Sequence, residues 1–473
     1  MTATLTSLSP ADPSDVLGEF AVADREAVGA AVSRARAAFP AWRDAGLEAR
    51  AQVLLRFAEI AQDAKEEIAE QIAREMGKAL WDARAEAGLL GPKVSVTLAE
   101  GMRFVERRDA AAGACATYHP RGVLAVLGPF NFPAHLPNGH IVPALATGNC
   151  VVFKPSEQTP AVGERLVELF HKAGLPEGVL EIVHGGAETG SSLARHPDVD
   201  AVLFTGSFPV GRELRKLTGD QPGKLLALEM GGNNAMIVLA DADLDLAASE
   251  AALSICATTG QRCTCAGRLF VAREVFDSFS EKLLRVLRGV RIGPPLEPGV
   301  FMGPLASRAA FDRLMSYRAL ARETEGERVL LVEPELPAPY VGPGIMRFES
   351  VRQTHPYQRD EIFGPEAALY PVDDLDQAIA ATNDSEYGLA ASIMTRDRSR
   401  YERCLGRVRT GILNWNKATV GASGKLPFGG SGRSGNDWPA GSTSTLYCTF
   451  PQAHLESNAE LDPDSLPPGM PRP

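Results

Sequence analysis

The stretch Cys150-Val151-Val152-Phe153-Lys154-Pro155-Ser156-Glu157 begins with four apolar residues and ends in a charged turn. The apolar part has the length of a buried strand, and a helical pattern follows it. Short strands and helices then alternate as far as residue 228, which predicts a parallel sheet with crossover helices and both faces covered. We expect strands at 150–153, 179–183, 201–204 and 225–228, and helices at 161–173, 189–196 and 210–217.

The segment before this region is predicted to be mostly helical. Apolar residues recur every three or four positions from Arg50 to Met76, which indicates an amphipathic helix capped by Gly77. A second helical stretch is expected at 81–104, and we expect both to serve packing only. Residues 1–20 are predicted to be irregular, and two short strands are expected at 114–119 and 123–127.

A second α/β block is predicted from Asn233 to about Ile412. The glycine-rich segment 421–435 should be a loop, residues 443–450 a final strand, and the proline-rich tail from Ser457 extended. Within the block we expect strands at 236–239 and 268–271 and helices at 244–258 and 274–288.

Composition excludes several classes of protein. The chain has 473 residues, enough for about three structural units, with 45% hydrophobic and 23% charged residues. A net charge of −11 argues against binding to nucleic acid or anionic membranes, and no apolar run reaches the ~20 residues of a membrane span. Residues 1–13 lack the features of a signal peptide. Seven cysteines are sparse and odd in number, which favours free thiols in a reducing cytoplasm.

Two stretches carry candidate chemistry. Gly260-Gln261-Arg262-Cys263-Thr264-Cys265 holds a thiol, and Leu228-Glu229-Met230-Gly231-Gly232 holds a carboxylate. A thiolate attacks carbonyl carbon well, and a buried carboxylate can activate a thiol or a water molecule. The alternative is a buried structural cysteine beside a glycine turn. The spacing of Cys256, Cys263 and Cys265 fits no zinc pattern, so we expect no metal.

A nucleotide site is suggested by Gly206-Ser207-Phe208-Pro209-Val210-Gly211, which follows a predicted strand. This segment lacks the middle glycine of a Rossmann fingerprint, but a helix N-terminus suits phosphate. Lys154 and Glu157 follow another strand and could hold the two hydroxyls of a ribose. The alternative for each is an ordinary turn.

Together these stretches resemble the NAD(P)-dependent aldehyde dehydrogenase superfamily, from about Phe20 to Phe450. Seven motifs in the same order make the resemblance specific. They are 129–133 (PFNFP), 154–157 (KPSE), 204–207 (FTGS), 228–232 (LEMGG), 260–263 (GQRC), 361–365 (EIFGP) and 427–430 (PFGG).

The resemblance implies an α/β fold with a Rossmann-type cofactor domain, an α/β catalytic domain and a small β oligomerisation arm, in a homodimer or homotetramer. The NAD-binding domain would comprise 1–106 and 125–230, the catalytic domain 231–435, the arm 107–124 and 436–455, and the extended tail 456–473.

The resemblance also implies the roles of residues. Cys263 would be the nucleophile, Glu229 the general base, and Asn131, with the backbone N–H of Cys263, the oxyanion donor. The thiohemiacetal would give hydride to the nicotinamide, and Glu229 would activate the water that hydrolyses the thioester. A carboxylate at Glu157 favours NAD over NADP. The implied cofactor contacts are Lys154, Ser156, Glu157, Gly185, Gly206, Ser207, Gly211, Glu361 and Phe363.

Three stretches are most similar to the branch of the family that oxidises N-succinylglutamate 5-semialdehyde in arginine catabolism: 132–140, 229–234 and 260–265. Such a substrate carries carboxylates, which Arg262, Arg433 or Lys425 could hold. Arg433 departs from the small residue expected there. The alternatives are a neutral or aromatic aldehyde, a coenzyme A-acylating enzyme, which Glu229 argues against, and a non-catalytic member, which the set Cys263, Glu229 and Asn131 argues against.

Overall fold

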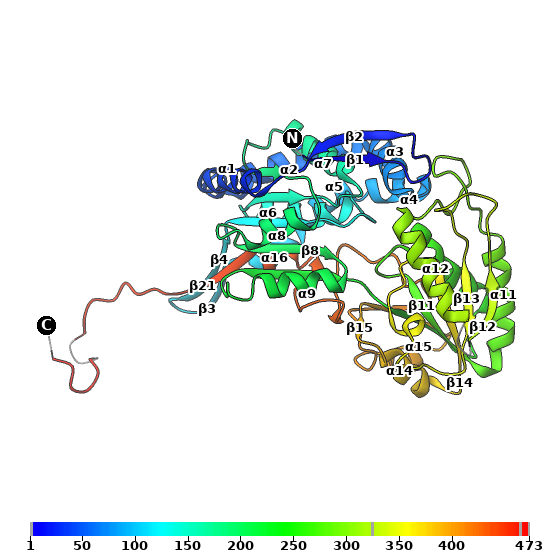
Figure 1. Cartoon of the computed structure of the whole chain (residues 1–473). Coiled ribbons are helices and arrows are strands. Elements are labelled where there is room, and N and C mark those ends of the chain that lie inside the picture. The colour runs from blue at the N-terminus through cyan, green and yellow to red at the C-terminus, as the bar shows by residue number, and fades with distance from the viewer. Residues whose placement is uncertain (1–2, 323–325, 463–465, 472–473) are drawn as a thin grey trace.

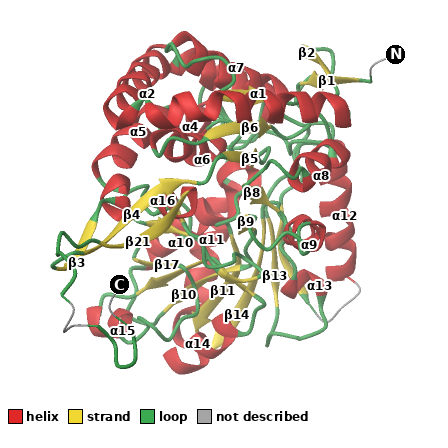
Figure 2. Ribbon diagram, turned by 90° about the vertical axis from the view of Figure 1, so that its left-hand side faces the viewer, coloured by secondary structure: helices red, strands yellow, loops and turns green. Residues whose placement is uncertain are grey.

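Three sheets organise the chain, one in each of two lobes and one in a projecting arm (Figure 1). The computed structural model describes residues 3–322, 326–462 and 466–471. Helices pack on both faces of the two larger sheets, which confirms the α/β class (Figure 2). No helix within these ranges is both long and apolar enough to cross a membrane.

The first sheet has five parallel strands in the order β7-β6-β5-β8-β9. The strand order reverses between β5 and β8, and ligands bind at the carboxyl ends of strands at such a point. The strands and helices predicted for this region are confirmed to within a few residues, whereas helix α6 was not predicted. The elements are β5 Val123–Leu127, α6 His135–Ala146, β6 Cys150–Lys154, α7 Pro160–Lys172, β7 Leu180–Ile182, α8 Ala187–Arg195, β8 Ala201–Gly206, α9 Phe208–Leu217 and β9 Leu225–Met230.

The second sheet has seven strands in the order β12-β13-β14-β11-β10-β16-β17, and among them only β12 runs antiparallel to its neighbour. Its strands are β10 Asn234–Val238, β11 Ala266–Ala272, β12 Glu327–Leu331, β13 Gly344–Arg347, β14 Glu366–Val372, β16 Ala390–Met394 and β17 Ile412–Trp415. Its helices are α10 Leu244–Cys256, α11 Phe276–Arg288, α12 Arg308–Arg322, α13 Pro356–Arg359, α14 Leu375–Asn383 and α15 Arg398–Glu402. Short strand pairs join β15 Tyr387–Gly388 to β19 Ser431–Gly432 and β18 Pro427–Phe428 to β20 Ala440–Gly441.

The N-terminal region differs from two predictions. The expected helix from Arg50 to Met76 is two helices, because the chain breaks at Ala64, although Gly77 does cap the second with φ of 82°. An irregular segment was expected over residues 1–20, but residues 4–21 hold two short paired strands, and the turn between them contains Pro10 and Pro13. The elements are β1 Thr4–Leu8, β2 Val16–Ala21, α1 Arg25–Asp44, α2 Gly46–Asp63, α3 Lys65–Met76, α4 Leu80–Ala87 and α5 Leu90–Ala99.

The arm is a three-stranded antiparallel sheet in the order β21-β4-β3, with β3 Arg108–Ala111, β4 Ala114–Pro120 and β21 Thr449–Leu455. The strand expected at 443–450 was misplaced, because 444–448 form helix α16 (Ser444–Cys448) and the strand begins at Thr449. Tyr447 is buried there and bonds His140, so tertiary packing overrides local strand preference. Residues 456–462 are exposed and lead away from both lobes (Figure 1). The predicted domain boundaries stay a prediction.

A buried carboxylate ties the N-terminal hairpin to the first lobe. Glu75, near the end of α3, accepts hydrogen bonds from the Ser7 hydroxyl at 2.5 Å and from the N–H groups of Ala161 and Val162 at 2.8 Å each. These two N–H groups open α7, where a helix N-terminus favours an acceptor. Burial nevertheless raises the pKa of Glu75 to about 7.

This pKa predicts a pH-dependent contribution to stability. The folded state binds the Glu75 proton more tightly than the unfolded chain, whose value is near 4.5. The contribution is therefore full below pH 4.5 and is lost as the pH rises through 7. As the pH rises from 4.5 through 7, the free energy of unfolding of the wild type should fall by up to about 3 kcal/mol relative to that of Glu75→Gln. Thermal unfolding of both proteins at low and high pH measures this difference. Unfolding temperatures that change with pH in the same way for both proteins would contradict the prediction.

Candidate active site

The candidate site lies where the first sheet faces the second. The loop after β5 carries Asn131, the turn after β8 carries Gly206 and Ser207, and β9 ends at Glu229 and Met230. All three segments leave the carboxyl edge of the first sheet. The chain then crosses directly from β9 to β10, so the site lies between the carboxyl edge of one sheet and the amino edge of the other.

The segment that crosses from β9 to β10, here called the crossing segment, has no room for side chains at Gly231 and Gly232. A Cβ on Gly231 would lie 1.9 Å from Oε2 of Glu361, and a Cβ on Gly232 would lie 2.7 Å from the carbonyl oxygen of Cys263. The Gly232 N–H donates to Oε1 of Glu361 at 2.8 Å. Glycine at both positions thus lets the Glu229 strand, the Cys263 loop and the Glu361 segment meet at one point.

The loop that carries Cys263 has an unusual backbone. Thr258 and Thr259 both have φ of 54°, a left-handed conformation that β-branched residues rarely adopt, and Gly260 follows with φ of 72°. A Cβ on Gly260 would lie 2.1 Å from the backbone of Gly364, so this glycine is needed for packing as well as for conformation.

Asn234, at the start of β10, anchors the same loop. Its Nδ2 donates to the carbonyl oxygens of Cys263 at 2.7 Å and of Cys265 at 2.8 Å, and its Oδ1 accepts from the N–H of Ala390. Cys263 and Cys265 are both partly exposed, whereas Cys256, at the end of α10, is buried. The Sγ of Cys265 donates to the carbonyl oxygen of Ala257 at 3.6 Å.

Asn131 lies beside the Cys263 loop. Its Nδ2 donates to the carbonyl oxygen of Gln261 at 2.8 Å, and the side chain is buried. An amide nitrogen carries two hydrogens, so one remains for another acceptor. Gln261 is itself fixed, because its side chain donates to Thr258 O and accepts from the N–H of Ala306.

Burial dominates the electrostatics of the site. Desolvation, helped by the charges of Glu361 and Glu229, raises the pKa of the Cys263 thiol, and Arg262 opposes that shift. Desolvation also raises the pKa of Glu229 well above its usual value and that of Glu361 to about 7. A thiol held in its protonated form needs a nearby group that can accept its proton.

Glu229 has an incompletely bonded carboxylate. A Cβ on Gly429 would lie 2.9 Å from its Oε1, and the Ala440 backbone hydrogen-bonds to the carboxylate. Its Oε2 is buried without a hydrogen-bond partner in the described chain. A buried carboxylate with a free oxygen is poised to take up a proton.

Residues at the ends of β6 and β8 can hold a dinucleotide. Lys154 is buried and donates to the carbonyl oxygens of Pro155 and Gly185, while Nζ lies 3.7 Å from the exposed Glu157 carboxylate. Ser156 is buried and accepts from the N–H of Gln158. Gly185 has φ of 147°, and its Cβ would clash with Thr189.

The turn from β8 into α9 has the form of a phosphate cradle. A Cβ on Gly206 would lie 2.4 Å from the ring of Phe204, and one on Gly211 2.4 Å from Sδ of Met230, so strand and helix pack tightly. Ser207 is the N-cap of α9, is exposed and makes no side-chain cap bond. The first N–H groups of α9 are therefore available to an anion, and the residues fit a pyrophosphate.

Glu361 and Phe363 lie on the opposite side, in the second lobe. Phe363 has φ of 60°, and its ring meets that of Phe130 edge to face at 5.8 Å. A strained backbone held by packing is frequent at ligand sites.

The three cationic side chains predicted to hold substrate carboxylates differ in their contacts and exposure. Arg262 pairs with the buried Asp82 at 2.6 Å and stacks over Phe132, so its guanidinium already has partners. Arg433 pairs with Glu386 at 2.8 Å and lies over the ring of Phe208, at the start of α9. Lys425 is exposed.

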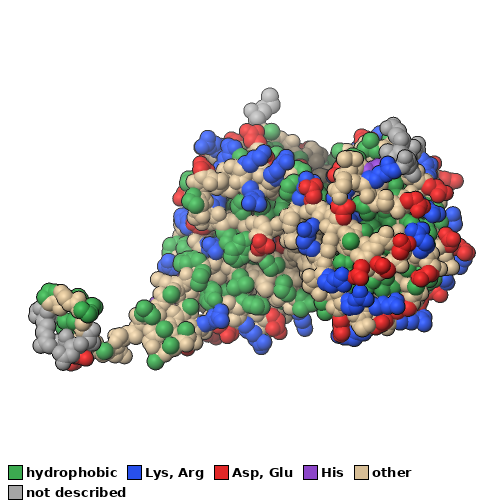
Figure 3. Space-filling view, turned by 90° about the horizontal axis from the view of Figure 1, so that it is seen from below, with side chains coloured by type: hydrophobic (Ala, Val, Ile, Leu, Met, Phe, Trp, Pro, Cys, Tyr) green, Lys and Arg blue, Asp and Glu red, His purple; other side chains and the backbone are tan. Residues whose placement is uncertain are grey.

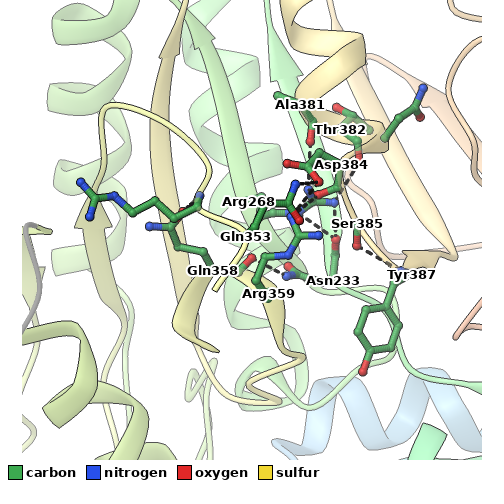
Figure 4. A network of polar contacts seen from close by, with 12 residues as sticks. Asn233, Arg268, Gln353, Gln358, Arg359, Ala381, Thr382, Asp384, Ser385 and Tyr387 are labelled. Carbon is green, nitrogen blue, oxygen red and sulfur yellow. Dashed lines mark hydrogen bonds and ion pairs between the residues drawn. The ribbon is translucent and has the colours of Figure 1, made fainter. Parts of the chain in front are cut away.

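Several residues that shape the site were missed in the sequence. Asn234, Gln261 and Asp82 each fix the Cys263 loop, but an amide or carboxylate without a neighbouring motif gives no signal of that role. A buried arginine supports the crossing segment from behind (Figure 4). Arg268 donates to the carbonyl oxygens of Asn233, Ala381 and Thr382, and Asn233 Nδ2 donates to Gln358 O.

Among the described residues, no group of three or more His, Cys, Asp or Glu side chains is arranged to hold a metal ion. The roles of the individual site residues stay predictions.

Comparison with known proteins agrees with this geometry. An N-succinylglutamate 5-semialdehyde dehydrogenase of Serratia proteamaculans is 42% identical over 470 residues, covering 98% of this chain and 95% of the relative. A 1-pyrroline-5-carboxylate dehydrogenase from Thermus with bound NAD has a TM-score of 0.91 and 30% identity, covering 96% of this chain and 90% of that one. An NADP-dependent enzyme of E. coli has a TM-score of 0.90 and 32% identity, covering 95% and 94%.

The family match extends over almost the whole length. The model of the aldehyde dehydrogenase family matches residues 2–451, which include every motif from Pro129 to Gly430. On its sequence, its fold and the arrangement of its site, the chain belongs to the aldehyde dehydrogenase family.

Proposed function

We propose that this protein catalyses the NAD-dependent oxidation of N-succinyl-L-glutamate 5-semialdehyde to N-succinyl-L-glutamate. One observation supports the reaction above all: the partly exposed Cys263, the Asn131 amide and the Glu229 carboxylate meet beside a phosphate cradle at a sheet switch point. The named activity of the relatives at 42% identity supports the substrate.

Cys263 is proposed to attack the aldehyde carbon. The thiol proton leaves to a base, a C–S bond forms, and the carbonyl oxygen gains the negative charge. The second N–H of Asn131 and the backbone N–H of Cys263 stabilise that charge where it develops, and one such donor is worth about 10²–10³ in rate. The bond from Asn131 to Gln261 orients the amide beforehand.

Glu229 is proposed to act in the second half of the reaction. After hydride leaves the carbon, a thioester links the acyl group to Cys263. Glu229 removes a proton from water, the resulting hydroxide adds to the thioester, and the C–S bond breaks to release the acid. The raised pKa of Glu229 suits a base that must hold a proton for part of each turnover.

The residues described above would hold NAD. When bound, NAD supplies a nicotinamide ring that accepts the hydride. Lys154, Ser156 and Glu157 would hold the adenosine ribose, and the first turn of α9 the pyrophosphate. Because the Glu157 carboxylate is exposed at the end of β6, it would repel a 2′-phosphate, so we propose NAD over NADP.

The arm is proposed to join subunits into a homodimer or homotetramer. Strands β21 and β3 each leave one edge unpaired in the described chain, and such edges accept a further strand. Phe450 and Leu455 are 43% and 91% exposed, and hydrophobic side chains gather toward the arm on the face in Figure 3.

The seven cysteines are all free, which supports a cytoplasmic location.

The central test is turnover by two variants. Cys263→Ser should lose about 10³-fold or more of NADH production, because the nucleophile is gone. Glu229→Gln should form one NADH per site and then stall at the thioester.

Since Glu229 and Cys263 both act after losing a proton, and both pKa values are raised, kcat/KM should rise with pH well above 4.5.

Adding coenzyme A to the wild type should leave the rate unchanged. Steady turnover by Cys263→Ser would overturn the mechanism, and a rate that requires coenzyme A would favour an acylating enzyme.

Substrate choice is tested with Arg433→Ala, assayed with a dicarboxylic semialdehyde and with a neutral aldehyde. If the guanidinium holds a substrate carboxylate, KM for the acidic aldehyde should rise about tenfold and KM for the neutral one should not. Arg433→Lys retains the charge and should be affected less. Equal effects on both aldehydes would place Arg433 outside the substrate site.

The arm is tested with Leu455→Lys, which puts a charge on the exposed end of β21. The variant should have a smaller molar mass than the wild type in light scattering after gel filtration. Val16→Lys, at the 55% exposed Val16 of the N-terminal hairpin, is the matched control and should not differ. A monomeric wild type, or no change at Leu455, would contradict the proposal.

A further inference from the structure

Helix α4 carries a row of charged side chains on one face. Asp82 and Glu86 are four residues apart within the helix, so they lie on one side of it, and Lys78, just before the helix, reaches the same side to pair with Glu86. All three are about 1% exposed. Packing alone does not require buried charges, and each of these side chains is directed at a loop of the active site.

Asp82 holds the Cys263 loop. Its Oδ1 accepts from Nη2 of Arg262 at 2.6 Å, and its Oδ2 accepts from the Thr258 hydroxyl at 2.5 Å. Arg262 Nε also donates to the Thr258 hydroxyl at 2.9 Å. These bonds fix both sides of the left-handed turn at Thr258 and Thr259, from which Cys263 is presented. Lys78 and Arg262 outweigh the burial that opposes ionisation and keep the pKa of Asp82 below its usual value.

Glu86 holds the loop of Asn131. Its Oε1 accepts from the N–H groups of Ala134 and His135 at 3.0 and 3.1 Å, where that loop enters α6. Its Oε2 accepts from Nζ of Lys78 at 2.7 Å, in an ion pair with no exposure to solvent. A carboxylate at the N-terminus of α6 also interacts favourably with the helix dipole.

Phe132 connects Lys78 to Arg262, the partner of Asp82. Its ring has Lys78 Nζ 3.5 Å from its centroid and the Arg262 guanidinium 5.1 Å from it, so it is enclosed by two cations. Phe132 is the residue next to Asn131. The nucleophile loop and the oxyanion loop are therefore bound to one short helix and, through Asn131 and Gln261, to each other.

We propose that α4 is a positioning element, in which Asp82 and Glu86 set the distance between the Cys263 sulfur and the Asn131 amide, and in which Arg262 serves this network. The proposal rests on the proposed function. Donors stabilise an oxyanion only over a narrow range of positions, and a displacement of about 1 Å can cost about 10²-fold in rate. These residues do not touch the substrate, so their loss should lower kcat and leave KM nearly unchanged.

The test uses two substitutions at Thr258. Thr258→Val keeps the shape and the β-branch but removes the hydroxyl that bonds Asp82, whereas Thr258→Ser keeps the hydroxyl. Rates are expressed per mole of protein that elutes as folded enzyme in gel filtration, which corrects for any unfolded protein. Thr258→Val and Asp82→Asn should lower kcat about 10–100-fold with KM for NAD and aldehyde within about twofold, and Thr258→Ser should retain most of the activity.

Asp200→Asn is the matched control. Asp200 also accepts from one arginine, Arg36, and from one further donor, the Val123 N–H, but it lies at the opposite end of β8 from the site. It should change the unfolding temperature and not kcat. A kcat within twofold of the wild type in both Thr258→Val and Asp82→Asn would overturn the proposal.

Two other outcomes would also overturn the proposal. One is a rise in KM for acidic aldehydes alone, which would make Arg262 a substrate contact. The other is an active Cys263→Ser enzyme, which would remove the proposed function itself. An inactive Cys263→Ser beside a fully active Thr258→Val would remove only the positioning role.

Discussion

The close approach of distant parts of the chain at three glycines is the constraint on which the site depends. A Cβ at Gly231, Gly232 or Gly260 would fall 1.9, 2.7 or 2.1 Å from the Glu361 carboxylate, the Cys263 carbonyl and the Gly364 backbone. Nothing larger than hydrogen fits at these points. The β9–β10 crossing, the thiol loop and the 361–365 segment therefore share one small volume, although they come from distant parts of the chain.

This proximity also explains the electrostatics. Carboxylates at Glu229 and Glu361 are removed from water by the same packing that brings them near Cys263, and all three groups become harder to ionise. A protonated thiol beside a carboxylate that readily takes a proton is a stable resting arrangement. In the proposed reaction, Cys263 would become a nucleophile by losing this proton. A thiol that stays protonated reacts slowly with other electrophiles, because the thiolate is the reactive form.

The sequence predicted most of the first lobe, because apolar strands of four to six residues between helices leave few alternatives to a parallel sheet. It also singled out Cys263, Glu229 and Asn131, which the fold brings to the region between the two sheets. It failed where local pattern and packing disagree. Residues 444–448 read as strand but form α16, which Tyr447 holds against His140. The two strands within residues 1–20 were missed because each is short and half exposed.

The most important feature that the sequence did not predict was the role of α4. The helical stretch expected at 81–104, which includes most of α4, was predicted to serve packing only, and no sequence pattern distinguishes a buried carboxylate from a solvated one. Only the fold shows that Asp82 and Glu86 face inward, because their partners Arg262 and Ala134 lie far along the chain. Long-range partners of this kind cannot be read from a single sequence.

The position of strand β21 in the sequence determines when the arm can fold during synthesis. Residues 449–455 pair along the whole length of β4, whose residues emerge from the ribosome more than three hundred positions earlier. Until residues 449–455 are synthesised, β4 has only the four-residue β3 beside it and its other edge stays open. The arm is thus completed only after both lobes have been synthesised, and a chain released before residue 449 lacks its third strand.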